Sequence, residues 1–166
     1  MPKITLYALI NFQGGQLTLT SACPDLRPVG FNNAAGSLSA TEPWVLYSER
    51  DYQGDTLVAP LHVFDLGAIN DQVSSLRPIG SGPRCIALFQ HSHYRGRMVV
   101  LGEEISNLKA IDFNDQVTSV VVVGGTWALF SDANYSGKTV KLSPGNYIDS
   151  AAVGLGNDVL SSLRPI

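Results

Sequence analysis

Apolar residues recur at every second position in four short segments of the chain, each just after a glycine. The pairs are Leu17 and Leu19, Leu57 and Ala59, Val99 and Leu101, and Val140 and Leu142. A period of two places alternate side chains on one face of a β-strand, so each segment is predicted to be a strand with one buried face. No segment sustains a period of 3.6 residues, and the best helical candidate, residues 148–155, is about two turns at most. The pattern therefore predicts an all-β protein.

Four similar units of about 41 residues make up the chain. Each begins with an aromatic residue, four further residues, a second aromatic residue, any residue and a glycine, and successive starts are 40, 42 and 41 positions apart. The copies are Tyr7/Phe12/Gly14, Tyr47/Tyr52/Gly54, Phe89/Tyr94/Gly96 and Phe130/Tyr135/Gly137. Chance would give roughly 0.1 such matches in a chain of this composition, so the copies are a repeat. An aromatic pair followed by glycine predicts a folded hairpin whose rings cover the end of the core and whose glycine adopts a positive φ.

Each hairpin is followed about 25 residues later by a polar string of six residues. The four strings are residues 32–37, 70–75, 114–119 and 157–162. They are rich in Asn, Asp, Ser and Thr, whose side-chain oxygens are ligands for hard cations such as calcium. The same residues also form Asx and Ser turns that lead into strands without any ligand. For a single copy, both the calcium ligand and the turn remain possible. In the last three copies an apolar residue of the string also pairs with one just after it, such as Val73 with Leu76, which predicts the start of a buried strand.

A longer period groups the four units in pairs. The sequence Leu-Arg-Pro-Ile at 76–79 recurs at 163–166, and Trp44 and Trp127 begin equivalent segments. We therefore expect two domains, residues 1–80 and 81–166, with linker composition at 80–83. Short strands, frequent turns and the lack of crossover helices predict antiparallel β-sandwiches. The equivalent positions of the two tryptophans favour core packing over a platform for stacking on sugars.

Composition narrows the class of protein further. Lys and Arg number 11 against 14 Asp and Glu, and the formal charge of −3 argues against nucleic acid as a partner. Apolar runs such as Val120–Val123 are far short of the ~20 residues of a membrane helix, and residues 1–6 lack the hydrophobic stretch of a signal peptide. With only Cys23 and Cys85, half the chain apart, we expect two buried thiols in a reducing compartment, and hence a cytoplasmic protein.

Other chemical motifs in the chain are weak. Residues 136–139 read Ser-Gly-Lys-Thr like the end of a phosphate-binding loop, but Asp132 stands where that loop needs a glycine. His91 and His93 could pair on one face, yet no further zinc ligand lies near them in sequence. No nucleophile, base and orienting group form a recognisable set, so an enzyme is not expected.

The hairpin and the polar string together, in this order and four times from Ile4 to Ile166, resemble the βγ-crystallin superfamily. The resemblance implies two Greek-key β-sandwich domains of two motifs each. It also implies calcium binding, because the calcium-binding members carry the string Asn/Asp-Asn/Asp-x-x-Ser/Thr-Ser. Lens members have mostly lost this string, so the chain resembles an invertebrate or other early-branching two-domain member.

The resemblance also implies a set of calcium ligands. Each site takes the backbone carbonyl of the third string position and the hydroxyl of the fifth from one motif, and the side chain of the second position from the other motif. The second domain would form one site from Gln116, Thr118 and Asp158 and another from Val159, Ser161 and Asp115. The first domain would form one site from Gln72, Ser74 and Asn33, and a degenerate one from Ala34 and Asp71 with Gly36 at the hydroxyl position. A further carbonyl from a hairpin is expected in each site, but its residue is not identifiable from the sequence.

The sequence thus favours a non-enzymatic protein that binds calcium ions for stability or buffering, with no nucleic-acid or membrane partner. We expect a monomer with paired domains, with a dimer left open, and tighter binding in the second domain. The alternative is a binding module on the same fold, a protease inhibitor or a lectin-like protein, since fold does not fix function. Gly36→Ser is expected to restore a missing hydroxyl ligand, provided that residue 36 does not need a positive φ.

Overall fold

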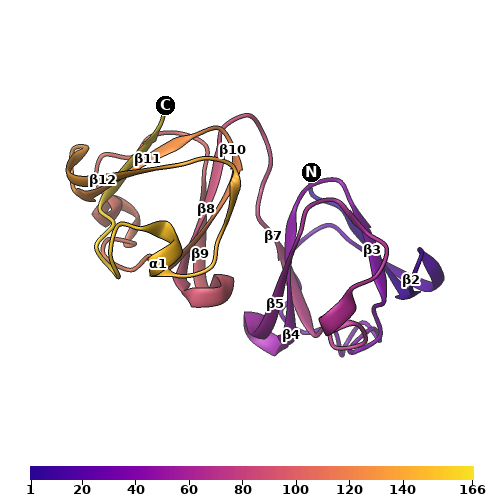
Figure 1. The fold of residues 1–166 in the computed structure, drawn as a ribbon. Helices are drawn as coiled ribbons and strands as arrows, with labels where there is room; N and C mark the ends of the chain where they lie inside the picture. Colours follow the sequence, from indigo (N-terminus) through magenta and orange to yellow (C-terminus); the bar gives the residue numbers. More distant parts are fainter. The chain divides into compact units, whose positions relative to one another are not determined.

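The computed structural model describes residues 1–166 as two compact units, Met1–Ile79 and Gly80–Ile166 (Figure 1). The strands of the first unit are β1 (Ile4–Leu9), β2 (Gln13–Leu19), β3 (Ser37–Ala40), β4 (Trp44–Glu49), β5 (Gln53–Ala59), β6 (His62–Val63) and β7 (Ser75–Pro78). Those of the second unit are β8 (Cys85–His91), β9 (Arg95–Leu101), β10 (Ser119–Gly124), β11 (Trp127–Asp132), β12 (Ser136–Leu142), β13 (Gly145–Tyr147) and β14 (Ser162–Pro165). The all-β prediction is confirmed.

Helical segments are short. They comprise the 3-10 turns η1 (Arg50–Tyr52), η2 (Gly67–Ile69), η3 (Ser92–Tyr94) and η4 (Leu108–Ile111) and one α-helical turn, α1 (Ser150–Val153). The α-helix lies inside the predicted helical candidate and is capped by the Asp149 side chain, which accepts a hydrogen bond from the Ala152 N–H. None of these segments has the length and apolar character needed to cross a membrane.

Each unit consists of two antiparallel sheets that exchange strands between the two motifs. In the first unit the strand orders are β2-β1-β3-β6 and β5-β4-β7. Strand β6 belongs to the second motif but pairs with β3 of the first, with Val63 opposite Leu38. In return, Cys23 of the first motif forms a bridge with Leu76 of β7. This exchange is Greek-key connectivity, and it brings the polar loops of the two motifs together.

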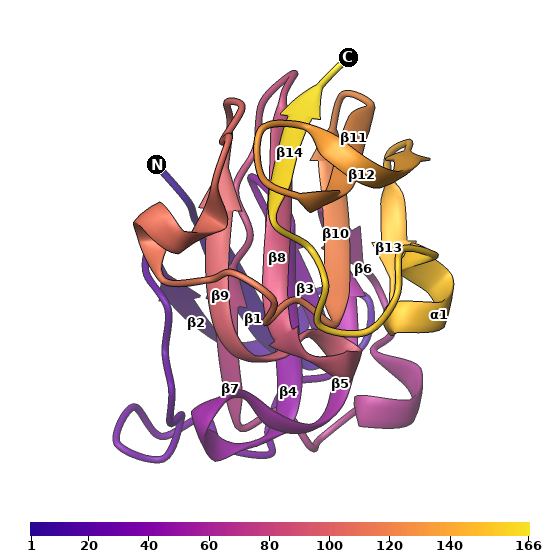
Figure 2. The same ribbon diagram turned by 90° about the vertical axis from the view of Figure 1, so that its left-hand side faces the viewer.

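The second unit repeats the exchange. Its strand orders are β13-β10-β8-β9 and β12-β11-β14, and Figure 2 shows β9, β8, β10 and β13 side by side in this order. Tyr147 of β13 lies opposite Val120 of β10, and Ile105 bridges to Leu163 of β14. The predicted architecture of two Greek-key β-sandwiches is therefore confirmed.

Each unit encloses its own hydrophobic core. Trp44 and Trp127 are fully buried, one in each core, which confirms their predicted packing role. Apolar residues within the polar strings are buried as well, among them Val73, Val117 and Leu160. The alternating apolar residues of the predicted strands pack against the same cores, so the period of two identified the inward faces correctly.

The four aromatic hairpins share one conformation. The ring centroids of the aromatic pairs are 5.7, 5.5, 5.6 and 5.8 Å apart in chain order. The hairpin glycines have φ of 80–83°, as predicted, and a Cβ on Gly54 or Gly137 would collide with the hydroxyl of a hairpin serine. Glycine is thus required at this position both by its φ and by the close approach of the hairpin.

The two cysteines are thiols in different units. Cys85 is buried as expected, whereas Cys23 is only half-buried. The difference arises because Cys23 lies on a short bridge at the border of a sheet, where its Sγ donates to the Asp25 carbonyl at 3.2 Å.

Candidate metal sites

The last serine of each polar string is buried and fastens the hairpin of its own repeat. The Ser75 hydroxyl donates to the Glu49 carbonyl at 2.6 Å and accepts from the Tyr52 N–H at 3.0 Å. The other three serines make the same pair of bonds at the same distances, namely Ser37, Ser119 and Ser162. Sequence reasoning missed this role, although the serine stands in all four copies, including the degenerate one. These hydroxyls therefore hold each hairpin beside the string of its own repeat.

The second position of each string has a left-handed backbone. Its φ is 55° at Asn33, 60° at Asp71, 53° at Asp115 and 54° at Asp158. Asn and Asp are the non-glycine residues that tolerate this region best, so a turn by itself accounts for the residue type. The N–H of Asn33 donates to the Val73 carbonyl across the motif boundary, and Asp71 and Asp115 make the equivalent bonds to the opposite motif. The second-position side chain of one motif is thereby placed beside the fifth position of the other.

In the second unit the structure brings the predicted ligands together in two pairs. The Ser161 hydroxyl donates to Asp115 Oδ1 at 3.2 Å and to the Val159 carbonyl at 3.4 Å. The Thr118 hydroxyl donates to Asp158 Oδ1 at 3.2 Å. In both pairs the hydroxyl comes from one motif and the carboxylate from the other, as the ligand assignment requires.

Two adjacent pockets surround these pairs. One is lined by Asp115, Val159 and Ser161 together with the hairpin residues 131–133. The other is lined by Gln116, Thr118 and Asp158 together with the hairpin residues 90–92. Both aspartates border both pockets. Hairpin residues therefore border both pockets, as the expected hairpin ligand requires.

The first unit has one comparable site with a weaker donor set. The Ser74 hydroxyl donates to Asn33 Oδ1 at 3.1 Å and to the Gln72 carbonyl at 3.3 Å. Asn32 also borders this pocket, and its Oδ1 is buried without a hydrogen-bond partner, an acceptor that a cation or a water molecule would satisfy. The pocket is lined by two arginines and two carboxylates besides these neutral groups, namely Arg27, Arg50, Glu49 and Asp51. Because its nearest side-chain oxygens are uncharged and cations are close, this site is the poorer one for calcium.

The fourth set of predicted ligands does not line one pocket. Asp71 borders a pocket with the hairpin residues 8–11, but Ala34 and Gly36 are not among the lining residues. Gly36 has no positive φ, yet a Cβ on it would lie 2.9 Å from the carbonyl carbon of Leu9. The condition set for Gly36→Ser is met, because residue 36 has no positive φ, but the hairpin backbone occupies the space that a serine Cβ would need. This close approach argues against the expected gain of a ligand.

A hydrogen bond records the same close approach. The Gly36 N–H lies 2.7 Å from the Tyr7 carbonyl, whereas the equivalent bonds from Ser74, Thr118 and Ser161 are 2.9, 2.9 and 3.0 Å long. The first hairpin therefore packs closer to its string than the other three. The glycine is explained by this packing rather than by the loss of a ligand alone.

Carboxylates and imidazoles by themselves form no site in this chain. No group of three or more His, Cys, Asp or Glu side chains lies close enough to hold a metal ion. His91 and His93 are both exposed. A cation bound at the paired loops would thus rely on carboxylate, hydroxyl and carbonyl oxygens together, which is the donor set that calcium prefers.

The chain is a two-domain Greek-key protein. Each domain contains two motifs, and the polar loops of the two motifs face each other. The family model described as Beta/Gamma crystallin matches residues 3–79 and 85–166, and the chain belongs to this family. Beta-crystallin B2 of Homo sapiens and that of Oryctolagus cuniculus are each 30% identical to it, over 99% of this chain and 85% of theirs.

Among solved structures, geodin, a beta-gamma crystallin from Geodia cydonium, matches with a TM-score of 0.78 over 99% of both chains, at 20% sequence identity. This likeness concerns the fold. It confirms the predicted two-domain fold.

Proposed function

We propose that the protein is a non-enzymatic, cytoplasmic βγ-crystallin whose fold is stabilised by calcium ions bound to its second unit. Asp115, Val159 and Ser161 would hold one ion, and Gln116, Thr118 and Asp158 the other. The first unit would bind one ion more weakly through Asn33, Gln72 and Ser74. We further propose a monomer without nucleic-acid or membrane partners.

The reciprocal hydroxyl–carboxylate pairs of the second unit carry this proposal. An Asx turn explains an aspartate with positive φ within one motif, but it does not require a hydroxyl of the opposite motif to face the carboxylate. The Thr118–Asp158 and Ser161–Asp115 pairs have this arrangement at 3.2 Å each. Both aspartates are solvent-exposed, so a cation from solution can reach them.

Calcium is expected to raise the melting temperature because the ligands of one site come from distant parts of the chain. Asp115 and Ser161 are 46 residues apart, and their site exists only in the folded state. A ligand that binds only the folded state stabilises it by about 2.7 kcal/mol at a hundredfold excess over its dissociation constant.

Thermal melts of the full chain in chelator and in millimolar calcium test the proposal. Asp115→Asn and Asp158→Asn keep a residue that tolerates positive φ but remove the charge, so each should reduce the calcium-dependent rise. Asp112→Asn is the matched control, because Asp112 has φ of 55° and borders neither pocket. Identical melts of the wild type with and without calcium would refute the stabilising role.

The binding-module alternative gains no specific support. Both tryptophan rings are fully buried and thus inaccessible for stacking on a sugar. The hairpins keep one compact conformation in all four repeats.

A further inference from the structure

Each unit has one basic residue at an equivalent position beside one candidate site. The site is that of Ser74 in the first unit and that of Ser161 in the second. Equivalent hydrogen bonds tie the preceding loop to this serine: Leu26 N–H to the Ser74 carbonyl at 2.9 Å, and Leu108 N–H to the Ser161 carbonyl at 2.8 Å. The residues that follow the two leucines are Arg27 and Lys109. Both line the pocket of the adjacent site.

The basic side chain has a charged partner in the first unit and none in the second. In the first unit Asp25 accepts hydrogen bonds from Arg27 Nε at 3.0 Å and Nη2 at 2.8 Å, and these bonds hold the pKa of the Asp25 carboxyl below its ordinary value. In the second unit Asn107 takes the place of Asp25. Its Oδ1 accepts the Lys109 N–H at 3.0 Å, as Asp25 accepts that of Arg27, but the amide carries no charge to offset the ammonium group. Lys109 forms no salt bridge.

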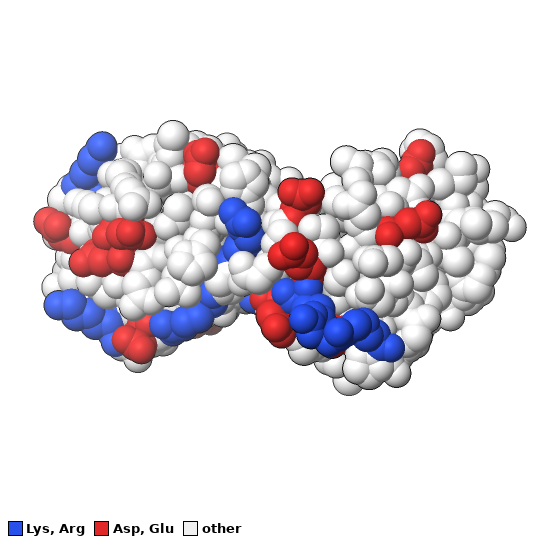
Figure 3. All heavy atoms as spheres, turned by 90° about the horizontal axis from the view of Figure 1, so that it is seen from below, with Lys and Arg blue, Asp and Glu red and all other residues white.

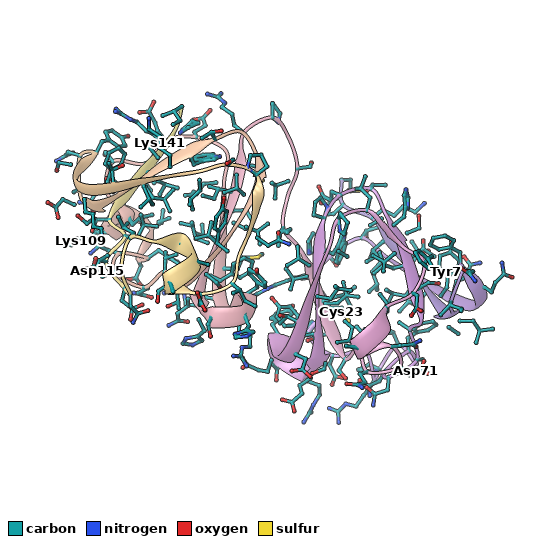
Figure 4. The ribbon with its side chains drawn as sticks, viewed as in Figure 1. Tyr7, Cys23, Asp71, Lys109, Asp115 and Lys141 are labelled. Atoms are coloured by element: carbon teal, nitrogen blue, oxygen red, sulfur yellow. The ribbon has the colours of Figure 1, made fainter.

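The pocket that Lys109 lines also contains the aspartates of the candidate calcium sites. Lys109 lines the same pocket as Asp115, Asp132 and Asp158. Figure 4 shows Lys109 and Asp115 at the same corner of the second unit, and Figure 3 shows basic and acidic side chains as close neighbours on the face that it presents.

The neighbouring Thr118–Asp158 pocket is lined by no lysine or arginine. Arg97 approaches it from outside, but its guanidinium is hydrogen-bonded to the Gln116 side chain and lies 4.0 Å from the Asp112 carboxylate. The two candidate sites of the second unit therefore differ in their lining: a lysine lines the Asp115–Ser161 pocket, whereas the cation nearest to the other pocket, Arg97, is held by Gln116 outside its lining.

We propose that Lys109 is a tethered cation that lowers the calcium affinity of the Asp115–Ser161 site and so makes the Thr118–Asp158 site fill first. The inference rests on the proposed function. A calcium ion entering the Asp115–Ser161 site would meet the repulsion of the ammonium group at its border. A unit charge acting on a divalent ion from roughly 7 Å in water changes the binding constant by about threefold to tenfold at low ionic strength.

The test uses the full chain and two lysine variants. Lys109→Met removes the charge and keeps a long side chain, while the Lys109 N–H bond to Asn107 is made by the backbone and is retained. Lys141→Met is the matched control, since Lys141 is an exposed residue of β12 that borders neither pocket (Figure 4). Calcium is titrated at low ionic strength, and the amide signals of Ser161 and Thr118 in ¹H–¹⁵N NMR spectra report each site separately.

In the wild type and in Lys141→Met, the Thr118 signal should move at lower calcium than the Ser161 signal. In Lys109→Met, the Ser161 site should gain about threefold to tenfold in affinity and the Thr118 site less, and 0.5 M salt should diminish the gain. Calcium binding with no gain on Lys109→Met would overturn this inference and leave the proposed function intact. If neither signal responds to calcium in any variant, both are overturned.

Discussion

The substitution Gly36→Ser separates a missing ligand from a packing requirement. A Cβ at residue 36 would lie 2.9 Å from the carbonyl carbon of Leu9, 3.1 Å from the Ala8 oxygen and 3.2 Å from the Ile10 nitrogen. All three atoms are backbone, so relief requires the hairpin itself to move. Overpacking of this kind costs typically 1–3 kcal/mol.

We therefore expect Gly36→Ser to destabilise the first unit without creating a calcium site. For a unit of this size, 1 kcal/mol corresponds to about 4–8 °C, so a cost of 1–3 kcal/mol should lower the melting temperature of the first unit by roughly 4 to 24 °C. Gly15→Ser is the control, because Gly15 has no positive φ and nothing lies within 4 Å of a Cβ placed on it.

Each unit contains one buried tryptophan, which gives a selective assay. In a Trp127→Phe background, Trp44 fluorescence follows the unfolding of the first unit alone, in chelator and in calcium. A Gly36→Ser protein with the melting temperature of its parent and a new calcium-dependent rise would refute the packing argument. It would show that the hairpin yields and that the glycine marks only a lost hydroxyl.

Two further expectations follow from the second unit's donors and from buried phenols. The separately expressed halves, residues 1–80 and 81–166, should differ in calorimetric titration with calcium. The second half should bind calcium more tightly, because its sites pair hydroxyls with carboxylates, whereas the first half offers the uncharged Asn33. Tighter calcium binding by the first half would contradict the ligand assignment. Burial raises the pKa of Tyr47 and of Tyr94 to about 12 from the ordinary 10, which favours the neutral phenol in the folded state. The stabilising contribution of these two phenols is thus complete below pH 10 and is lost as the pH rises from about 10 to about 12. Phenolate absorbance of the two residues and the loss of folded protein should therefore appear together in that range. If both phenols ionise near pH 10 while the protein is still folded, this prediction is wrong.

Much of the fold could be predicted from the sequence because the determining interactions are local or periodic. A period of two marks an inward strand face wherever it occurs, and the predicted pairs pack against the two cores. The hairpin glycine was equally predictable, since a positive φ beside two aromatic residues is a property of a few consecutive residues. The fourfold copy of both patterns fixed the number of motifs and the family resemblance.

The exchange of strands could not be predicted in this way. Nothing in the residues 62–63 of β6 indicates that they pair with β3 of the other motif rather than within their own. Pairing between strands depends on which edges become adjacent after the sheets pack, and that depends on the whole unit.

The detailed geometry of the candidate sites also depends on the packing of the whole unit. The sequence by itself specified which residues carry oxygen ligands, and the resemblance specified how the motifs combine. Only the tertiary structure showed that the first hairpin closes on Gly36, that buried serines such as Ser75 hold each hairpin, and that Lys109 borders the acidic pocket of Asp115. Each of these features brings together segments that are far apart in the chain. Such approaches depend on small differences in distance or on a single side chain, and they produce no periodic pattern in the sequence.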